Sequence, residues 1–232
     1  EMYSAGIDRL THQPLSFSVS ETTEGVHIHI IDAELMGKGE KEKKDLYIEG
    51  VQNNGIINHY EYIINSEGTI EIRHVLKPEG KMPLWFPRIG LTLTVSDALD
   101  QVKWYGRGPQ ENYPDRKTGY PMGIYASTVQ AMYEPYLMPQ DYGLRTDVRW
   151  LQLTTDKGIG LQFKMNEWFN FNIYPYSTDN LTKAMYTYQL QKQKGMTLNL
   201  DYATTGVGCT ARGVFGAYKA MPQEYRRTIS IR

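Results

Sequence analysis

Two acidic residues in a stretch rich in glycine and proline are the first candidates for chemistry. The stretch WYGRGPQENYPDRKTG (Trp104 to Gly119) contains Glu111 and Asp115, four positions apart. Paired carboxylates are the groups that perform general acid and base catalysis in glycoside hydrolysis. On a helix both would share a face, but Pro109 and Pro114 predict a loop. The spacing therefore does not fix the distance between the two carboxylates.

Two arginines in the same stretch favour a structural role for these acids. Arg107 and Arg116 lie close to them in sequence, and guanidinium groups bind carboxylates in a fixed fork geometry. Gly106 and Gly108 permit backbone geometry that a side chain would forbid. We therefore predict a salt-bridged corner in place of an acid/base pair.

Two histidines are the second candidates. His27 and His29 lie two positions apart on a predicted strand, so they share a face as two metal ligands would. No third ligand follows at a recognisable spacing, and we predict no metal site. The sequence has no nucleophile signature either, and the glycines of GRGPQ run into proline instead of the helix N-terminus that binds phosphate.

The elements that must position these residues are mostly β-strands. Alternating apolar and polar residues rich in β-branched and aromatic types are typical of half-buried strands. Turn residues separate two of these segments at 65–68 and two more at 156–158. About a dozen short strands with one helix predict an all-β fold, a large sandwich or barrel. The clearest strand patterns cover residues 25–33, 45–51, 59–76, 84–97, 148–165, 169–177, 196–203 and 225–232.

One segment has helical periodicity. In Asp179–Gln193 the residues Leu181, Ala184, Met185 and Tyr188 follow the i, i+3, i+4, i+7 spacing. Asp179 or Thr178 is expected to cap its first turn.

Length and charge limit the class of protein. The 232 residues are 41% hydrophobic, enough to bury the core of one large domain over 1–232. A net charge of −1 and the absence of a basic face argue against nucleic-acid binding. The alternating charges of Lys38–Lys44 predict a solvated loop, and Cys209, as the sole cysteine, excludes an internal disulfide. No apolar run spans a bilayer and the first residues lack signal-peptide features, so we expect a soluble chain of unknown compartment.

Aromatic residues are abundant, with 18 Tyr, 4 Trp and 6 Phe. Several cluster in Trp168–Tyr176 and in Tyr133–Gly143. Tyrosine and tryptophan stack on sugar rings, but they equally fill the core of a sandwich. Composition and periodicity thus indicate a large β domain, and sugar binding is one of two interpretations.

Three blocks carry the argument further. WYGRGPQENYPDRKTG, YEPYLMPQDYGLRTDVRWLQL and FNFNIYPYSTDNL occur in this order between about Pro87 and Asn199. In order and spacing they resemble the C-terminal domain, or small chain, of the β-galactosidases of glycoside hydrolase family 2. The resemblance implies a galactose-mutarotase-like β-supersandwich of mainly antiparallel strands. It also implies that two catalytic glutamates lie in a separate (β/α)8 barrel, which this chain lacks.

The resemblance also implies a role and partners. The chain would be a non-catalytic part of a β-galactosidase, supporting the barrel, the assembly and one wall of the cleft that binds the β-galactoside. Its partners would be the remaining domains of the same polypeptide in a homo-oligomeric parent, with neither nucleic acid nor membrane. The chain itself would hold no cofactor, whereas the parent would use Mg or Na ions.

Site residues follow from the same resemblance. The motif is the structural hallmark of the domain, and its members are Trp104, Gly106, Gly108, Pro109, Asn112, Tyr113 and Asp115. Contact with the sugar is assigned to Glu111, Arg116 and Arg145, with maintenance of the fold as the alternative for each.

Two departures from the family pattern stand out. The usual Arg-Ala-Pro-x-Asp-Asn-Asp opening does not precede Tyr3, so we expect the first strands of the domain to be missing. The loop Thr204–Pro222 lacks the tryptophan on which many members stack the sugar. Two alternatives therefore stay open: a free carbohydrate-binding module, and an aldose 1-epimerase that would use His59 or His74 with a carboxylate.

Overall fold

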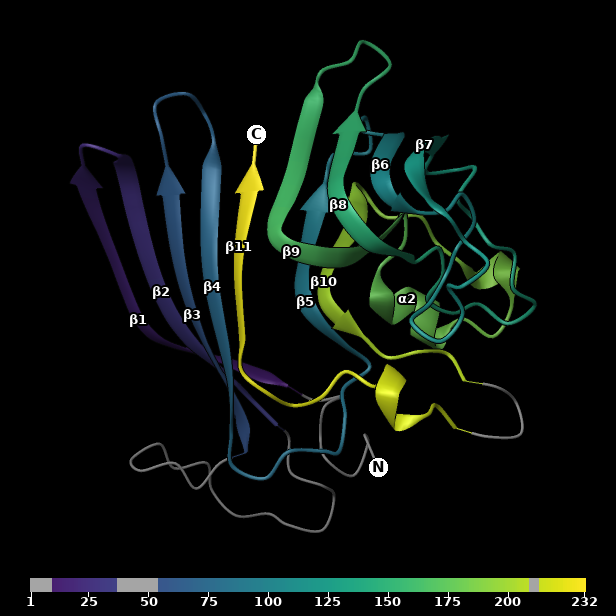
Figure 1. Ribbon diagram of the computed structural model, residues 1–232, viewed down its shortest axis with the longest axis horizontal. Coiled ribbons are helices and arrows are strands. Elements are labelled where there is room, and N and C mark those ends of the chain that lie inside the picture. The colour runs from purple at the N-terminus through teal and green to yellow at the C-terminus, as the bar shows by residue number, and fades with distance from the viewer. Residues whose placement is uncertain (1–9, 37–53, 209–212) are drawn as a thin grey trace. The chain divides into compact units, whose positions relative to one another are not determined.

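The computed structural model describes residues 10–36, 54–208 and 213–232 (Figure 1). The predicted strand 45–51, the charged run Lys38–Lys44 and Cys209 lie outside these residues. The chain divides into two compact units: unit 1 comprises residues 1–87 and 220–232, and unit 2 comprises residues 88–219. The single domain over 1–232 stays a prediction.

Unit 1 is an antiparallel sheet in the order β1-β2-β3-β4-β11 (Figure 1). The β3–β4 turn follows from its sequence: the side chain of Asn65 accepts hydrogen bonds from the backbone amides of Glu67 and Thr69. Gly68 takes a φ of +79° there, a conformation that favours glycine. The strands are β1 (Thr11–Thr22), β2 (Gly25–Leu35), β3 (Gly55–Ile64), β4 (Ile70–Glu79) and β11 (Tyr225–Ile231).

Strand β1 is absent from the predicted elements. Its apolar residues alternate with serines, but Leu15, Phe17 and Val19 are 43%, 69% and 53% exposed, so burial does not enforce the pattern. Pro14 sits next to a register shift in the β1–β2 pairing. Among the described strands β1 pairs only with β2, which makes it an edge.

Unit 2 is an antiparallel sheet in the order β7-β6-β8-β9-β10-β5. Strand β9 is 15 residues long and visibly bent in Figure 1. It pairs with β8 over residues 160–171, with register shifts, and with β10 over residues 170–174. Sequence patterns predicted two strands in this segment. The strands are β5 (Arg88–Val95), β6 (Gln101–Arg107), β7 (Met122–Thr128), β8 (Arg145–Thr154), β9 (Gly160–Tyr174) and β10 (Met196–Thr204).

The core of unit 2 is aromatic and aliphatic. Its largest fully buried side chains come from four of the six strands, β6, β8, β9 and β10, and from the loop before β8. Alternate residues of a strand face the same side of the sheet. Of the predicted aromatic clusters, Phe169, Phe171, Tyr174 and Tyr142 are buried, whereas Trp168 is 59% exposed. The largest fully buried side chains include Trp104, Leu144, Leu151, Phe163, Phe171, Tyr174 and Leu198.

The predicted helix is shorter than expected. Helix α2 covers Thr178–Lys183, and the 3-10 turns η2 and η3 cover Thr187–Gln189 and Gly216–Tyr218. The cap is Ser177, whose side chain accepts from the amide of Asn180, so the prediction of Asp179 or Thr178 was wrong. The helix stops because Ala184 is extended, which leaves Met185 and Tyr188 exposed.

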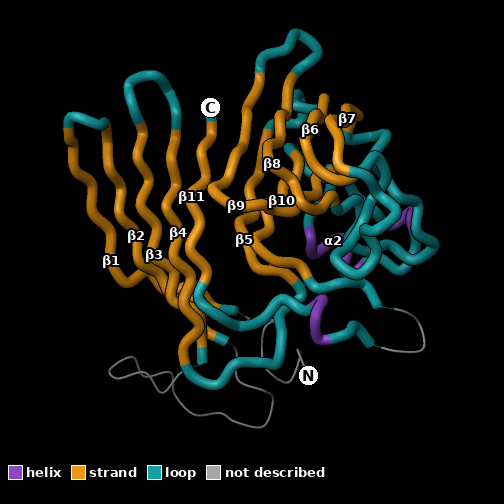
Figure 2. The backbone as a smooth tube through the Cα atoms, viewed as in Figure 1, coloured by secondary structure: helices purple, strands orange, loops and turns teal. Residues whose placement is uncertain are grey.

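These elements confirm the all-β class with antiparallel strands and one short α-helix. Figure 2 shows that strands and loops make up nearly all of the described chain. No helix among the described residues is long and apolar enough to span a bilayer.

Candidate functional site

The glycine- and proline-rich motif begins at the end of β6. Trp104 is buried, and its indole nitrogen donates a hydrogen bond of 3.0 Å to the carbonyl of Arg107. A Cβ on Gly106 would lie 2.8 Å from the side chain of Val148 on β8, so glycine lets the two strands approach. The chain then leaves the strand through a cis peptide between Gly108 and Pro109.

Glu111 is the most heavily bonded carboxylate of the motif. It accepts hydrogen bonds from Arg116 (2.7 Å), from the backbone amide of Gly143 (2.8 Å), from the hydroxyl of Tyr113 (3.3 Å) and from the hydroxyl of Tyr136. Burial raises the pKa of Glu111, but these donors outweigh it and hold the pKa below its ordinary value. Of the predicted salt-bridged corner, the ion pair between Glu111 and Arg116 is present.

The second ion-paired group is centred on Asp147 of β8, where β8 is irregular. Its carboxylate accepts from Arg107 (2.6 Å) and from Lys117 (2.8 Å). Asp147 has a φ of 56°, the left-handed region that few side chains adopt. Burial raises the pKa of Asp147, yet Lys117 and Arg107 lower it below the ordinary value. The two cations hold this backbone kink in place.

Asn112 joins the motif to the start of β8. Its backbone amide donates to the carbonyl of Leu144 (2.8 Å), and its side-chain oxygen accepts from the amide (3.1 Å) and the hydroxyl of Thr146. Its side-chain nitrogen donates to the carbonyl of Gln110 (3.0 Å). Asn112 is completely buried, and every polar group of its side chain is used.

Asp115 joins the motif to a loop far along the chain. Its Oδ1 accepts from the amide of Val207 (3.0 Å) and its Oδ2 from the amide of Gly208 (2.7 Å). A Cβ on Gly206 would lie 2.3 to 2.6 Å from this carboxylate, so only glycine leaves room for it. The motif therefore positions the start of the Thr204–Pro222 loop.

The three residues predicted to contact sugar lie in different settings. Arg116 has a side chain that is 48% exposed, whereas that of Glu111 is 7% exposed behind it. Arg145 is buried: its guanidinium packs 5.4 Å from the Trp104 ring and donates to the carbonyl of Gly143. Burial lowers the pKa of Arg145 to about 10. The contacts of Arg145 are those of the fold-maintaining alternative, and sugar contact stays a prediction for all three.

A buried polar network in unit 2 escaped the sequence interpretation. Strands β9 and β10 place Asn172 opposite Asn199, and Thr92 of β5 donates to Asn199 (2.8 Å). Arg88 lies 3.1 Å from the carboxylate of Asp201 and 3.2 Å from that of Asp141. The sequence does contain a signal for this network. In the segments FNFNI (169–173) and LNLDY (198–202), polar residues alternate with apolar ones along a strand.

Burial controls the ionisation of this network. It raises the pKa of Asp201 to about 6, even though Arg88 lowers it. Burial lowers the pKa of Arg88, but Asp201 and Asp141 outweigh that effect and raise it. Arg88 therefore stays charged, and it is the ion that keeps a buried Asp201 carboxylate tolerable.

A pocket of about 490 Å³ lies elsewhere in unit 2. Tyr133, Tyr142 and Tyr176 line it together with Asp97 and Asp100. Rings and acceptors of these kinds suit a polar ligand with an apolar face.

The histidines that an epimerase would need lie in unit 1. His74 is buried, stacks on Tyr60 at 4.2 Å and hydrogen-bonds to Asn58 at 3.0 Å. Burial, with His59 nearby, lowers the pKa of His74 to about 4. A neutral, enclosed imidazole is poorly placed to exchange protons with a substrate.

The chain thus contains an antiparallel β domain in which both motif carboxylates, Glu111 and Asp115, accept hydrogen bonds from groups of the chain itself. The chain matches the family described as "Beta galactosidase small chain" over residues 8–231, and it belongs to that family.

Individual relatives agree with this assignment. A β-galactosidase of Priestia megaterium is 38% identical over 63% of this chain, which covers 14% of that protein. A β-galactosidase of Vibrio cholerae is 31% identical over 89% of this chain and 18% of its own length. The chain thus spans less than a fifth of the length of these relatives.

One solved structure also resembles the fold. It is a GalM/aldose epimerase homologue from C. elegans, and the match covers 94% of this chain and 68% of that chain. The sequence identity is 11% and the TM-score is 0.45, so this match carries no argument about function.

Proposed function

We propose that this chain is a non-catalytic domain of a β-galactosidase, which supports the catalytic part of the parent protein and one wall of its sugar cleft. Family membership and the names of the relatives support the parent activity, hydrolysis of terminal β-D-galactose. The catalytic glutamates would lie in a separate barrel of the parent.

The occupancy of the motif carboxylates carries the proposal. A general acid must hold a proton and release it to the glycosidic oxygen, and a nucleophile must have a free oxygen. Glu111 has a lowered pKa and accepts from four donors, while both oxygens of Asp115 are bound to backbone amides. Neither group is available for hydrolysis.

Hydrolysis and mutarotation assays test the non-catalytic role. We expect the chain neither to release nitrophenol from 2-nitrophenyl β-D-galactoside nor to accelerate the mutarotation of α-galactose in a polarimeter. Mixing the chain with the rest of the polypeptide, produced separately, should restore hydrolysis. Turnover by the chain alone, or full activity of the remainder without it, would contradict the proposal.

The tyrosine-lined pocket favours one second candidate, a carbohydrate-binding module. Isothermal titration with galactose distinguishes the two. Saturable binding that Tyr133→Ala abolishes, with no effect of the chain on hydrolysis by the remainder, would favour the binding module.

A further inference from the structure

Three potential metal ligands meet on one face of the unit 1 sheet. His27 and His29 lie on β2, and the β2–β3 register places Glu61 directly opposite His29. Each of the three side chains offers one ligand atom within 4.8 Å of the other two. Sequence spacing missed the third ligand because it comes from the neighbouring strand, 34 positions after His27.

The distances approach those of a tetrahedral site. Metal bonds of about 2.0–2.1 Å place the corners of a tetrahedron roughly 3.3 Å apart. The Nδ1 of His27 lies 3.4 Å from the Oε1 of Glu61, and the Nε2 of His29 lies 3.9 Å from the same oxygen. The side chain of His29 is half exposed, so a small rotation of its ring closes the longer distance.

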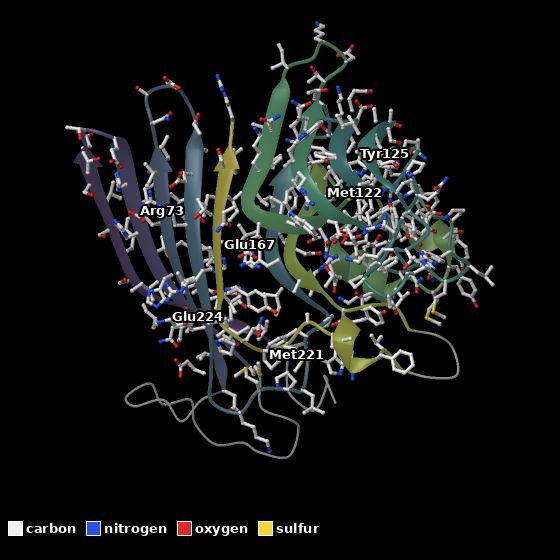
Figure 3. The ribbon with its side chains drawn as sticks, viewed as in Figure 1. Arg73, Met122, Tyr125, Glu167, Met221 and Glu224 are labelled. Atoms are coloured by element: carbon white, nitrogen blue, oxygen red, sulfur yellow. The ribbon has the colours of Figure 1, made fainter. Side chains whose placement is uncertain are left out.

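The surroundings orient two of the ligands. The Oε2 of Glu61 accepts a hydrogen bond of 3.1 Å from Arg73, which Figure 3 labels on the same sheet, and this leaves Oε1 for a metal. The Nε2 of His27 is buried and forms no hydrogen bond with any residue that the structure describes. When Nδ1 binds a metal, Nε2 carries the proton and faces the carboxylate of Glu24, 4.0 Å away. A carboxylate behind a ligating histidine is the usual support of such sites.

The local charge is complementary to a dication. Glu24, Glu61 and Glu71 contribute three negative charges around the cluster, and Arg73 contributes one positive charge. The net charge of these four groups is −2. Imidazole and carboxylate ligands select zinc-like transition ions, whereas magnesium and calcium prefer oxygen ligands alone.

We propose that His27, His29 and Glu61 bind one divalent transition-metal ion of the zinc class. The half-exposed His29 leaves the fourth position open to water. Because its ligands come from both strands, the ion would cross-link β2 and β3. This site is separate from the motif of unit 2 and does not depend on the role proposed for the domain.

Metal titration of the wild-type chain is the first test. Calorimetry with Zn²⁺ should show saturable binding of one ion per chain. Co²⁺ should give the intense visible bands of a tetrahedral site, and the imidazole nitrogen resonances of His27 and His29 should shift on addition of Zn²⁺. No binding, or binding that leaves both sets of resonances in place, would overturn the proposal.

Substitutions give the second test. Glu61→Gln keeps the size of the side chain and removes the anionic ligand, and His29→Ala removes a half-exposed ligand. Since loss of a mere supporting group costs about 10–100-fold in metal affinity, each variant should weaken Zn²⁺ binding at least tenfold. Zn²⁺ affinity equal to wild type in folded Glu61→Gln would overturn the proposal even if His29→Ala fails to fold.

His12→Ala is the matched control. His12 lies on β1 near two acids of β2, 3.8 Å from Asp32 and 3.9 Å from Glu34. These acids occupy the opposite face of β2 from His27 and His29, because side chains alternate along a strand. The control should bind Zn²⁺ as the wild type does, and a tenfold loss in it would show that binding is not located at the proposed cluster.

Discussion

The carboxylate of Asp115 holds the backbone amide of Gly208 at 2.7 Å, across 93 positions of the chain. With the amide of Val207 on its other oxygen, Asp115 uses both acceptors for one short backbone segment. We therefore expect Asp115→Asn to destabilise the chain by about 1–3 kcal/mol, because the new NH2 group faces a donor. Thermal unfolding measures this loss. Asp97→Asn, at an exposed turn, is the control and should unfold like wild type.

Gly206 is the complementary test of the same contact. A Cβ there would meet the Asp115 carboxylate at 2.3 to 2.6 Å, so Gly206→Ala should displace it and lower the melting temperature. A Cβ on Gly213, in the same loop, meets no atom of the described residues within 4 Å. Equal melting temperatures for Gly206→Ala and Gly213→Ala would show that the contact between Asp115 and the Val207 and Gly208 amides does not stabilise the chain.

Glu111 should make stability depend on acid pH. Its pKa in the folded chain lies below the ordinary 4.5, so its stabilisation is fully present above that pH and is lost as the pH falls through the folded value. The difference in free energy of unfolding between wild type and Glu111→Gln should therefore shrink on acidification. Urea titrations at pH 7 and below pH 4 measure it. A difference that stays constant would mean that the charge of Glu111 plays no part.

Removal of Arg88 should lower the free energy of unfolding more at pH 8 than at pH 5. Arg88→Met leaves Asp201 as a buried unpaired carboxylate, and breaking such a pair costs about 3–5 kcal/mol. The folded pKa of Asp201, about 6, already lies above the unfolded value, so its protonation favours the folded chain as the pH falls. Denaturation at pH 8 and pH 5 should show the smaller loss at pH 5. Arg88→Lys keeps the charge and should lose less at pH 8.

The exposed apolar side chains of β1 should promote self-association. Phe17 and Val19 stand out on a strand that pairs only with β2 among the described elements. Phe17→Ser should raise the monomer fraction in analytical ultracentrifugation. Leu84→Ser, which removes an equally exposed apolar side chain from a loop, should not. Similar sedimentation of wild type and Phe17→Ser across protein concentrations would count against self-association through β1.

Sequence patterns predicted the features that depend on residues close together in the chain. The β3–β4 hairpin followed from alternation and from the Asn65 to Gly68 turn, whose bonds span at most four residues. Charge signs within the motif predicted a salt-bridged corner, and the pair of Glu111 and Arg116 is present. Arg107, however, pairs with Asp147, outside the motif. In contrast, β1 carried a weak pattern, because its exposed face does not select for apolar residues.

Contacts made by distant segments could not be predicted in the same way. Glu111 meets Tyr136 and Gly143 because the loop before β8 returns to the motif, and Glu61 meets His27 because of one strand register. Neither spacing nor composition encodes such a register. It is set by which faces are buried across the whole sheet.

Strand β9 limits how this chain can change in length. Because its side chains alternate, one residue added near the bend would turn Asn170 and Asn172 to the opposite face and bring their apolar neighbours into the buried polar network. The tip of the β8–β9 hairpin, at 156–158, is exposed and can accept extra residues without moving any inward-facing side chain. Insertions and deletions should thus be tolerated at one end of this strand and selected against at its middle.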